Sequence, residues 1–147
     1  MARKKVQRPW LDYLVYLVVR SLVFTVQSLP IAPSYAMARG LAWLMYTVDK
    51  RHRLVGLENL RMAYGDAMTE AERDQVVRGV YRHFCMMLME IFHTPKRIRL
   101  ENYRKYIQLA GHGPVLDKLI SGEPMILLTG HYGNWEIAGY LFGLFGF

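Results

Sequence analysis

The 147-residue sequence has a single cysteine, Cys85, so it can form no internal disulfide and cannot supply a cysteine-based zinc site. Cys85 lies in an apolar run, so we interpret it as a buried thiol of a protein in a reducing compartment. Four of the five histidines have no partner at metal-ligand spacing: His52, His83, His93 and His112. No glycine-rich motif for a nucleotide phosphate occurs either. We therefore expect no metal and no cofactor.

Acidic residues are few, with 12 Asp and Glu against 19 Lys and Arg, which gives a net charge of +7. A basic surplus of this kind is typical of proteins that bind nucleic acid or an anionic membrane face. One basic cluster, Arg3, Lys4, Lys5 and Arg8, directly precedes an apolar run, and this placement favours lipid. The aromatic residues belong to apolar helical segments and show no stacking pattern, so no nucleic-acid partner is expected.

A long charge-free apolar run is also absent, although residues 10–29 come close. Twenty residues at about 1.5 Å each are enough to cross a hydrocarbon core of about 30 Å. Asp12, Tyr16, Arg20 and Gln27 fall on one narrow stripe at 100° per residue. The pattern predicts a membrane anchor helix whose stripe lies against protein.

Capping and turn signals predict further helices after the anchor. Pro30 and Pro33 end the anchor helix, and Ser34 can cap a second helix that runs toward the basic residues 50–53. A short helix over residues 54–64 follows, closed by a Gly-Asp turn.

A longer helix comes next. Thr69 and Glu72 have capping-box spacing, and Pro95 is expected to close the helix that they open. Its predicted apolar face consists of Val76, Val77, Val80, Phe84, Leu88 and Ile91. Three further residues are interpreted as core filling rather than as an acyl groove: Met86, Met87 and Met89.

The pattern changes in the last third of the sequence. Residues 106–109 alternate like a short strand, residues 113–120 suit a helix, and residues 125–129 form an apolar run typical of a buried parallel strand. The sequence thus predicts an α/β fold, with membrane-associated helices followed by the start of a sheet domain. Residues 1–32 would be the basic N-terminus and anchor, and residues 33–147 part of the sheet domain.

Polar residues with glycines beside them follow the predicted strand, where open α/β sheets usually bind ligands. Gly130 and Gly133 allow positive φ and close approach of a substrate, and a helix beginning near Asn134 would direct N–H groups at an anion. Glu136 could hold the imidazole of His131 while that group takes a proton from a hydroxyl. Alternatively, the pair is a loop histidine and a first-turn carboxylate favoured by the helix dipole.

Residues 129–136 read TGHYGNWE, and here the sequence resembles the lipid A biosynthesis lauroyl/myristoyl acyltransferases of the lysophospholipid acyltransferase superfamily. The resemblance extends to the anchor helix and to residues 57–60 and 122–124. It implies that His131 is the general base and Glu136 its acidic partner. It also implies acyl transfer from acyl carrier protein to a hydroxyl of a lipid A precursor, at the cytoplasmic face of the inner membrane.

Members of that family are about twice as long as this chain. The resemblance therefore implies an N-terminal half whose sheet domain is incomplete at the C-terminus and which is inactive by itself. Two other hypotheses remain open. The acceptor is another membrane lipid, such as a lysophospholipid or a phosphoinositide mannoside, or the chain is a non-catalytic module that binds anionic lipid or a partner.

Overall fold

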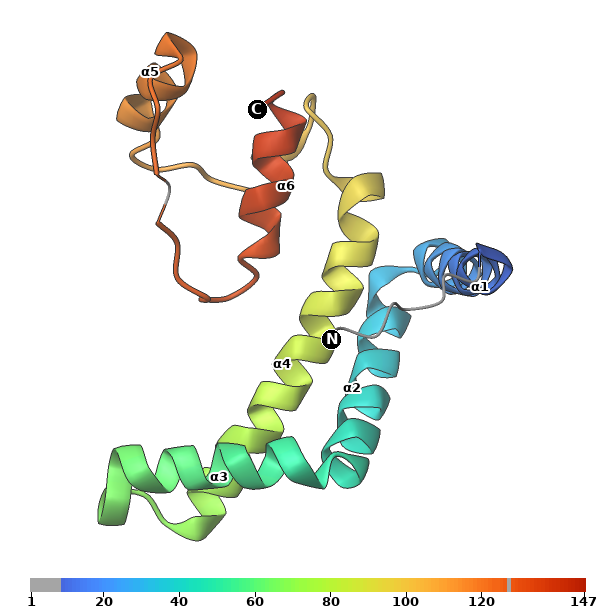
Figure 1. The fold of residues 1–147 in the computed structure, drawn as a ribbon, viewed down its shortest axis with the longest axis vertical. Helices are drawn as coiled ribbons and strands as arrows, with labels where there is room; N and C mark the ends of the chain where they lie inside the picture. Colours follow the sequence, from blue (N-terminus) through green and yellow to red (C-terminus); the bar gives the residue numbers. More distant parts are fainter. Residues whose placement is uncertain (1–8, 127) are drawn as a thin grey trace, which may run out of the picture. The chain divides into compact units, whose positions relative to one another are not determined.

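The computed structural model describes residues 9–126 and 128–147, and the basic cluster at residues 3–8 lies outside the described residues (Figure 1). The chain divides into two compact units, Met1–Phe92 and His93–Phe147. Every regular element in the described part of the chain is a helix. The predicted boundary between residues 32 and 33 is a separate hypothesis about domains and stays a prediction.

The first helix, α1 (Pro9–Ser28), agrees with the predicted anchor to within one residue at each end. By length and composition α1 is able to cross a membrane, and only 6% of its apolar window is buried. Its polar stripe has partners inside the N-terminal unit. The guanidinium of Arg20 donates to the hydroxyl of Tyr16, and the amide of Gln27 donates to the carbonyl of Phe92 at 2.9 Å. Asp12, Tyr16 and Arg20 are exposed, so of the four residues in the predicted stripe only Gln27 lies against protein.

The second helix, α2 (Ile31–Val48), begins three residues before the predicted cap. Ser34 is fully buried inside α2, and its hydroxyl donates to the carbonyl of Pro30 at 3.2 Å. The capping prediction was wrong because proline fits the first turn of a helix, where its missing N–H has no intrahelical partner. Pro33 thus belongs to α2 instead of preceding it.

The third helix, α3 (Lys50–Tyr64), starts four residues earlier than predicted. Asp49 is its N-cap, and the Asp49 side chain accepts a hydrogen bond from the backbone N–H of His52 at 3.2 Å. The predicted end is confirmed, because Gly65 follows with φ of 50° and Gly65–Ala67 forms a single 3₁₀ turn, η1.

The longest helix, α4 (Glu70–Arg97), opens with the predicted capping box. The backbone N–H of Thr69 donates to Glu72 Oε2 at 2.7 Å, and the N–H of Glu72 donates to Thr69 Oγ1 at 3.3 Å. These bonds from Thr69 lower the pKa of the Glu72 carboxyl. Pro95 does not close α4, which continues for two more residues before the N–H of Ile98 bonds to the carbonyl of Thr94.

The core of the N-terminal unit lies where α1, α2 and α4 meet; α2 and α4 run side by side in Figure 1. Its buried members are Val26, Ala38, Ala42, Cys85 and Met89. The core-filling interpretation of the methionines is confirmed, since Met87 and Met89 are buried and Met86 packs against this cluster.

The predicted apolar face of α4 is partly buried and partly exposed. Val77 is buried, but four of its members are between 39% and 48% exposed: Val76, Val80, Phe84 and Leu88. Periodicity marks all of the apolar surface of a helix, and the neighbouring helices cover only part of it.

The C-terminal unit contains the 3₁₀ turn η2 (Tyr103–Lys105) and the helices α5 (Gly113–Ser121) and α6 (Glu136–Leu144). The hydroxyl of Tyr140 donates to the carbonyl of Ile98 at 2.8 Å. Leu141 is the buried residue of α6. Helix α5 confirms the helix predicted over residues 113–120.

The predicted α/β fold class was wrong, because the described residues form helices and contain no strand. Residues 106–109 instead follow η2 as a turn and an irregular stretch, in which the N–H of Ile107 bonds to the carbonyl of Tyr103. In the run 125–129, Ile126 and Leu128 are 95% and 97% exposed, and residue 127 lies outside the described residues. Apolar β-type sequence becomes a strand only when a neighbouring strand bonds to its backbone.

Candidate functional site

The candidate base His131 lies in the irregular segment between α5 and α6, and its side chain is exposed. The imidazole packs edge to face with the indole of Trp135, with ring centroids 4.4 Å apart and planes at 66°. This contact is the interaction that the structure gives to His131. An exposed imidazole held by one aromatic neighbour is open to an incoming hydroxyl.

The two glycines of the motif differ in conformation. Gly133 adopts φ of 58°, in the left-handed region that favours glycine, whereas Gly130 does not adopt a positive φ. A tight turn begins at Gly130, because the N–H of Tyr132 donates to the carbonyl of Gly130 at 2.9 Å. A Cβ placed at Gly130 would meet nothing within 4 Å. Gly133 therefore determines the local backbone, and Gly130 leaves open space beside His131.

Helix α6 begins at Glu136, two residues after the predicted start near Asn134. Trp135 is its N-cap without a side-chain capping bond, and the N–H of Ile137 donates to the carbonyl of Asn134 at 3.3 Å. The Oδ1 atom of Asn134 is shielded from solvent. The exposed carboxylate of Glu136 lies in the first turn, where the helix dipole favours a negative charge.

The structure does not bring His131 and Glu136 together. Both residues are described, and no hydrogen bond or ion pair joins them. The indole of Trp135 occupies one side of the imidazole instead. The His131/Glu136 dyad therefore stays a prediction, and in this structure no carboxylate orients the imidazole of His131.

The residue that the sequence interpretation overlooked is Trp135. The motif gives Trp135 no role of its own, yet its ring is the contact of His131. Sequence spacing gave no signal for this contact, because i, i+4 side chains meet on a helix and residues 131–135 precede α6.

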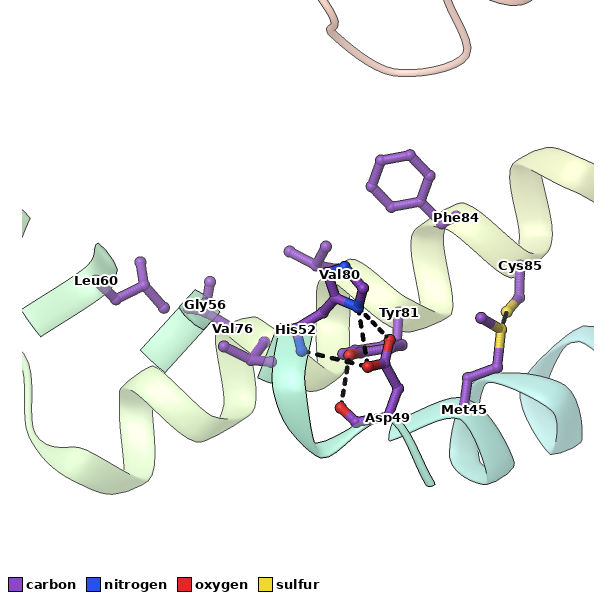
Figure 2. Close-up of a pocket in the computed structure, with 11 residues that line it drawn as sticks. Met45, Asp49, His52, Gly56, Leu60, Val76, Val80, Tyr81, Phe84 and Cys85 are labelled. Atoms are coloured by element: carbon purple, nitrogen blue, oxygen red, sulfur yellow. Dashed lines mark hydrogen bonds and ion pairs between the residues drawn. The ribbon is translucent and has the colours of Figure 1, made fainter. Parts of the chain in front are cut away.

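A second imidazole–carboxylate pair, unforeseen in the sequence, lies in the N-terminal unit. Asp49 Oδ2 is 2.8 Å from Nδ1 of His52, and hydrogen bonds from His52 are the main cause of the lowered pKa of the Asp49 carboxyl. The pair lies beside a pocket of about 440 Å³ between the end of α2, α3 and α4, and Figure 2 shows both residues among those that line it. Its walls include Leu60, Val80 and Phe84. The capping of α3 accounts for the pair.

Neither thiol nor metal chemistry has a prepared site in the described part of the chain. Burial raises the pKa of the Cys85 thiol, so this sulfur is a poor nucleophile. Among the described residues, no group of three or more His, Cys, Asp or Glu side chains could hold a metal ion.

Comparison with known families places these features in a class of proteins. The chain matches the sequence model of the bacterial lipid A biosynthesis acyltransferases over residues 2–146, which is nearly its whole length. The class is therefore that of the acyltransferases. Within it, the chain belongs to the bacterial lipid A biosynthesis acyltransferase family, which confirms the resemblance carried by TGHYGNWE. No curated protein and no solved structure matches the chain.

Proposed function

We propose that this chain carries the catalytic base of an enzyme that transfers a fatty acyl group from acyl carrier protein to a hydroxyl of a lipid A precursor. The observation that carries the proposal is the family match over residues 2–146. The exposed imidazole of His131, with open space at Gly130, supports it. An imidazole suits this task because histidine is the side chain that most often serves as a general base.

The reaction needs one base and no covalent enzyme intermediate. Nε2 or Nδ1 of His131 takes the proton of the acceptor hydroxyl while its oxygen attacks the thioester carbonyl. The new C–O bond forms, the C–S bond breaks, and the departing thiolate of the carrier takes the proton back from the imidazolium. The thioester already provides a good leaving group, so the buried thiol of Cys85 has no part in the step.

Glu136 would orient His131 only after a local rearrangement. The carboxylate and the imidazole are not bonded to each other in the structure, and the four irregular residues 132–135 separate them. Catalytic hydrogen bonds often tighten only when substrate is bound. We propose that acceptor binding moves the imidazole away from Trp135 and onto the Glu136 carboxylate, which then stabilises the imidazolium.

The membrane is the place where such an acceptor is found. Helix α1 is long and apolar enough to cross a bilayer, and little of it is buried by the rest of the chain. We propose that α1 holds the enzyme at the cytoplasmic face of the inner membrane, where a soluble acyl carrier protein meets a lipid acceptor. The exposed apolar residues of α1 include Trp10, Val18 and Phe24.

The test is acyl transfer from acyl carrier protein to a lipid A precursor by the natural full-length protein in detergent micelles. His131→Ala is expected to lower turnover by about 10² to 10⁴, the usual contribution of a general base. Glu136→Gln should lower it severely without loss of helical content. Cys85→Ala is the matched control and should keep near-normal turnover.

Three results would contradict the proposal. Near-normal turnover of His131→Ala would show that His131 is not the general base. Loss of turnover in a folded Cys85→Ala variant would point to a thiol intermediate. Transfer to a lysophospholipid or a phosphoinositide mannoside, but not to a lipid A precursor, would keep the chemistry and change the acceptor.

A further inference from the structure

One side of α2 carries no charge although it faces outward. We define the outer face of α2 as the exposed residues Pro33, Ala36, Met37, Gly40, Trp43, Leu44, Thr47 and Val48. At 100° per residue they fall within an arc of about 140°. Trp43 is 66% exposed, and Val48 is 71% exposed. Arg39, the one charged residue of α2, lies just outside this arc.

The opposite side of α2 is already used for packing. Its buried residues are Ser34, Ala38, Ala42 and Tyr46, and the two alanines belong to the core with α4. The helix is thus apolar on both sides, which is typical of helices covered all round by protein or by lipid. A contiguous exposed apolar face marks an interaction surface.

We propose that the outer face of α2 lies in the boundary layer of an anionic bilayer, beside α1, with its axis close to the membrane plane. The inference rests on the proposed membrane location of α1. Continuity carries it first, because α1 ends at Ser28 and α2 begins at Ile31. So short a connection leaves the start of α2 at the bilayer once α1 is inserted.

Charge at the far end of α2 favours the same occupant. The basic residues Lys50 and Arg51 follow α2 directly and are exposed, with Asp49 as the acidic residue before them, whereas Arg53 donates to the carbonyl of Tyr46 at 3.0 Å. Basic side chains next to an apolar helix bind anionic headgroups. Arg39, at the edge of the outer face, can extend its guanidinium to the same headgroups while its methylenes stay apolar.

Trp43 supports the placement of the outer face of α2 in the bilayer, and its fluorescence can be used to test that placement. An indole with an apolar body and one N–H donor favours the boundary between headgroups and hydrocarbon. The chain has three tryptophans, one in α1, one on the outer face of α2 and one beside His131: Trp10, Trp43 and Trp135. Single-tryptophan variants therefore separate the anchor from the outer face of α2.

The experiment measures quenching of tryptophan emission by lipids with brominated acyl chains. Full-length chain is reconstituted into vesicles of phosphatidylethanolamine and phosphatidylglycerol. One variant keeps only Trp43, through Trp10→Phe and Trp135→Phe. The other keeps only Trp10, through Trp43→Phe and Trp135→Phe. Both tryptophans are expected to be quenched several-fold more in brominated than in unbrominated vesicles.

The failures of the two proposals are distinguishable. Quenching of Trp10 without quenching of Trp43 overturns the inference about α2 and leaves the anchor in place. Absence of quenching at both sites overturns both proposals. A blue-shifted Trp43 emission without quenching shows that a second copy or another protein surface covers the face, and it also overturns the inference.

A charge placed on the outer face gives a second test. Leu44→Glu is expected to remove most of the Trp43 quenching, because a carboxylate at this position opposes burial in lipid, while Trp10 quenching stays unchanged. Gln75→Glu is the matched control, since it adds the same charge at an exposed polar position of α4. If Leu44→Glu folds normally and Trp43 stays fully quenched, the outer face does not lie in lipid.

Discussion

At the scale of single residues, one carboxylate joins two helices of the N-terminal unit. Asp74 on α4 accepts hydrogen bonds from the hydroxyl of Tyr46 on α2 and, at 2.6 Å, from Nε of Arg78. The Arg78 guanidinium also lies 4.0 Å from the centroid of the Tyr46 ring. The bond from Tyr46, and then the bond from Arg78, lower the pKa of the Asp74 carboxyl. The ionised form of Asp74 therefore stabilises the fold.

Asp74→Asn is expected to lower the free energy of unfolding by about 1 kcal/mol at neutral pH. This value is below the usual range of about 1.5 to 3 kcal/mol for hydrogen bonds to charged groups, because the Asp74 side chain is 35% exposed and solvent screens its charge. A carboxyl whose pKa is lowered by folding adds stability above its unfolded pKa, near 3.9, and loses it as the pH falls through the folded pKa. The difference between wild type and variant should thus shrink below about pH 4.

The measurement is denaturant unfolding in detergent micelles at neutral pH and at acid pH. Asp66→Asn is the matched control, because Asp66 is exposed and makes none of the described side-chain hydrogen bonds. Equal stability of Asp74→Asn and Asp66→Asn at neutral pH would contradict the role given to Asp74.

At the scale of elements, one glycine sets how closely α3 approaches α4. A Cβ built on Gly56 of α3 would lie 3.3 Å from Cγ2 of Val77, which is one of the buried residues of α4. A Cβ built on Gly79, within α4, would meet nothing within 4 Å. The two glycines therefore form a matched pair, both in helix interiors and only one in a contact.

Gly79→Ala is expected to raise the free energy of unfolding by about 0.5 to 1 kcal/mol, because alanine favours the helix more than glycine does. Gly56→Ala should gain less, since Val77 has to move. Gly56→Leu should lose about 1 to 3 kcal/mol through overpacking, whereas Gly79→Leu should not. Thermal unfolding of the four variants in one detergent checks this. Equal stability of the two leucine variants would mean that α3 and α4 do not pack as described.

At the scale of the whole molecule, the apolar surface of the N-terminal unit predicts membrane association. Nearly every residue of α1 is exposed, and the outer face of α2 adds to this surface. Burying apolar area stabilises the bound state by about 25 cal/mol per Å². Summed over α1 and the outer face of α2, this free energy is far larger than the one that a few basic residues gain from headgroups. The full-length chain should therefore stay with the membrane fraction in high salt and at alkaline pH, and should be released by detergent.

Cell fractionation with these washes checks the prediction. A peripheral protein that binds only through charge would be released by salt, and this result would contradict the role of α1. Recovery of the intact chain as a soluble monomer would do so more strongly.

The sequence by itself determined the features that depend on a few neighbouring residues. The ends of α1, the capping box of Thr69 and Glu72, and the turn at Gly65 follow from local preferences, since the partners lie within four positions along the chain. The family was recognised in the same way, because TGHYGNWE is a contiguous motif and the family match confirms it.

Only the tertiary structure decided which apolar surfaces are covered. Periodicity predicted the apolar residues of α4 but not that Val77 is buried while Val80 and Phe84 are half-exposed. The run 125–129 has the composition of a buried strand, yet the described residues supply no paired strand. His131 has Trp135 as its contact, although sequence spacing suggested Glu136. In each case the outcome depends on a partner distant in the chain or on the exact turn of the backbone, and local preference fixes neither.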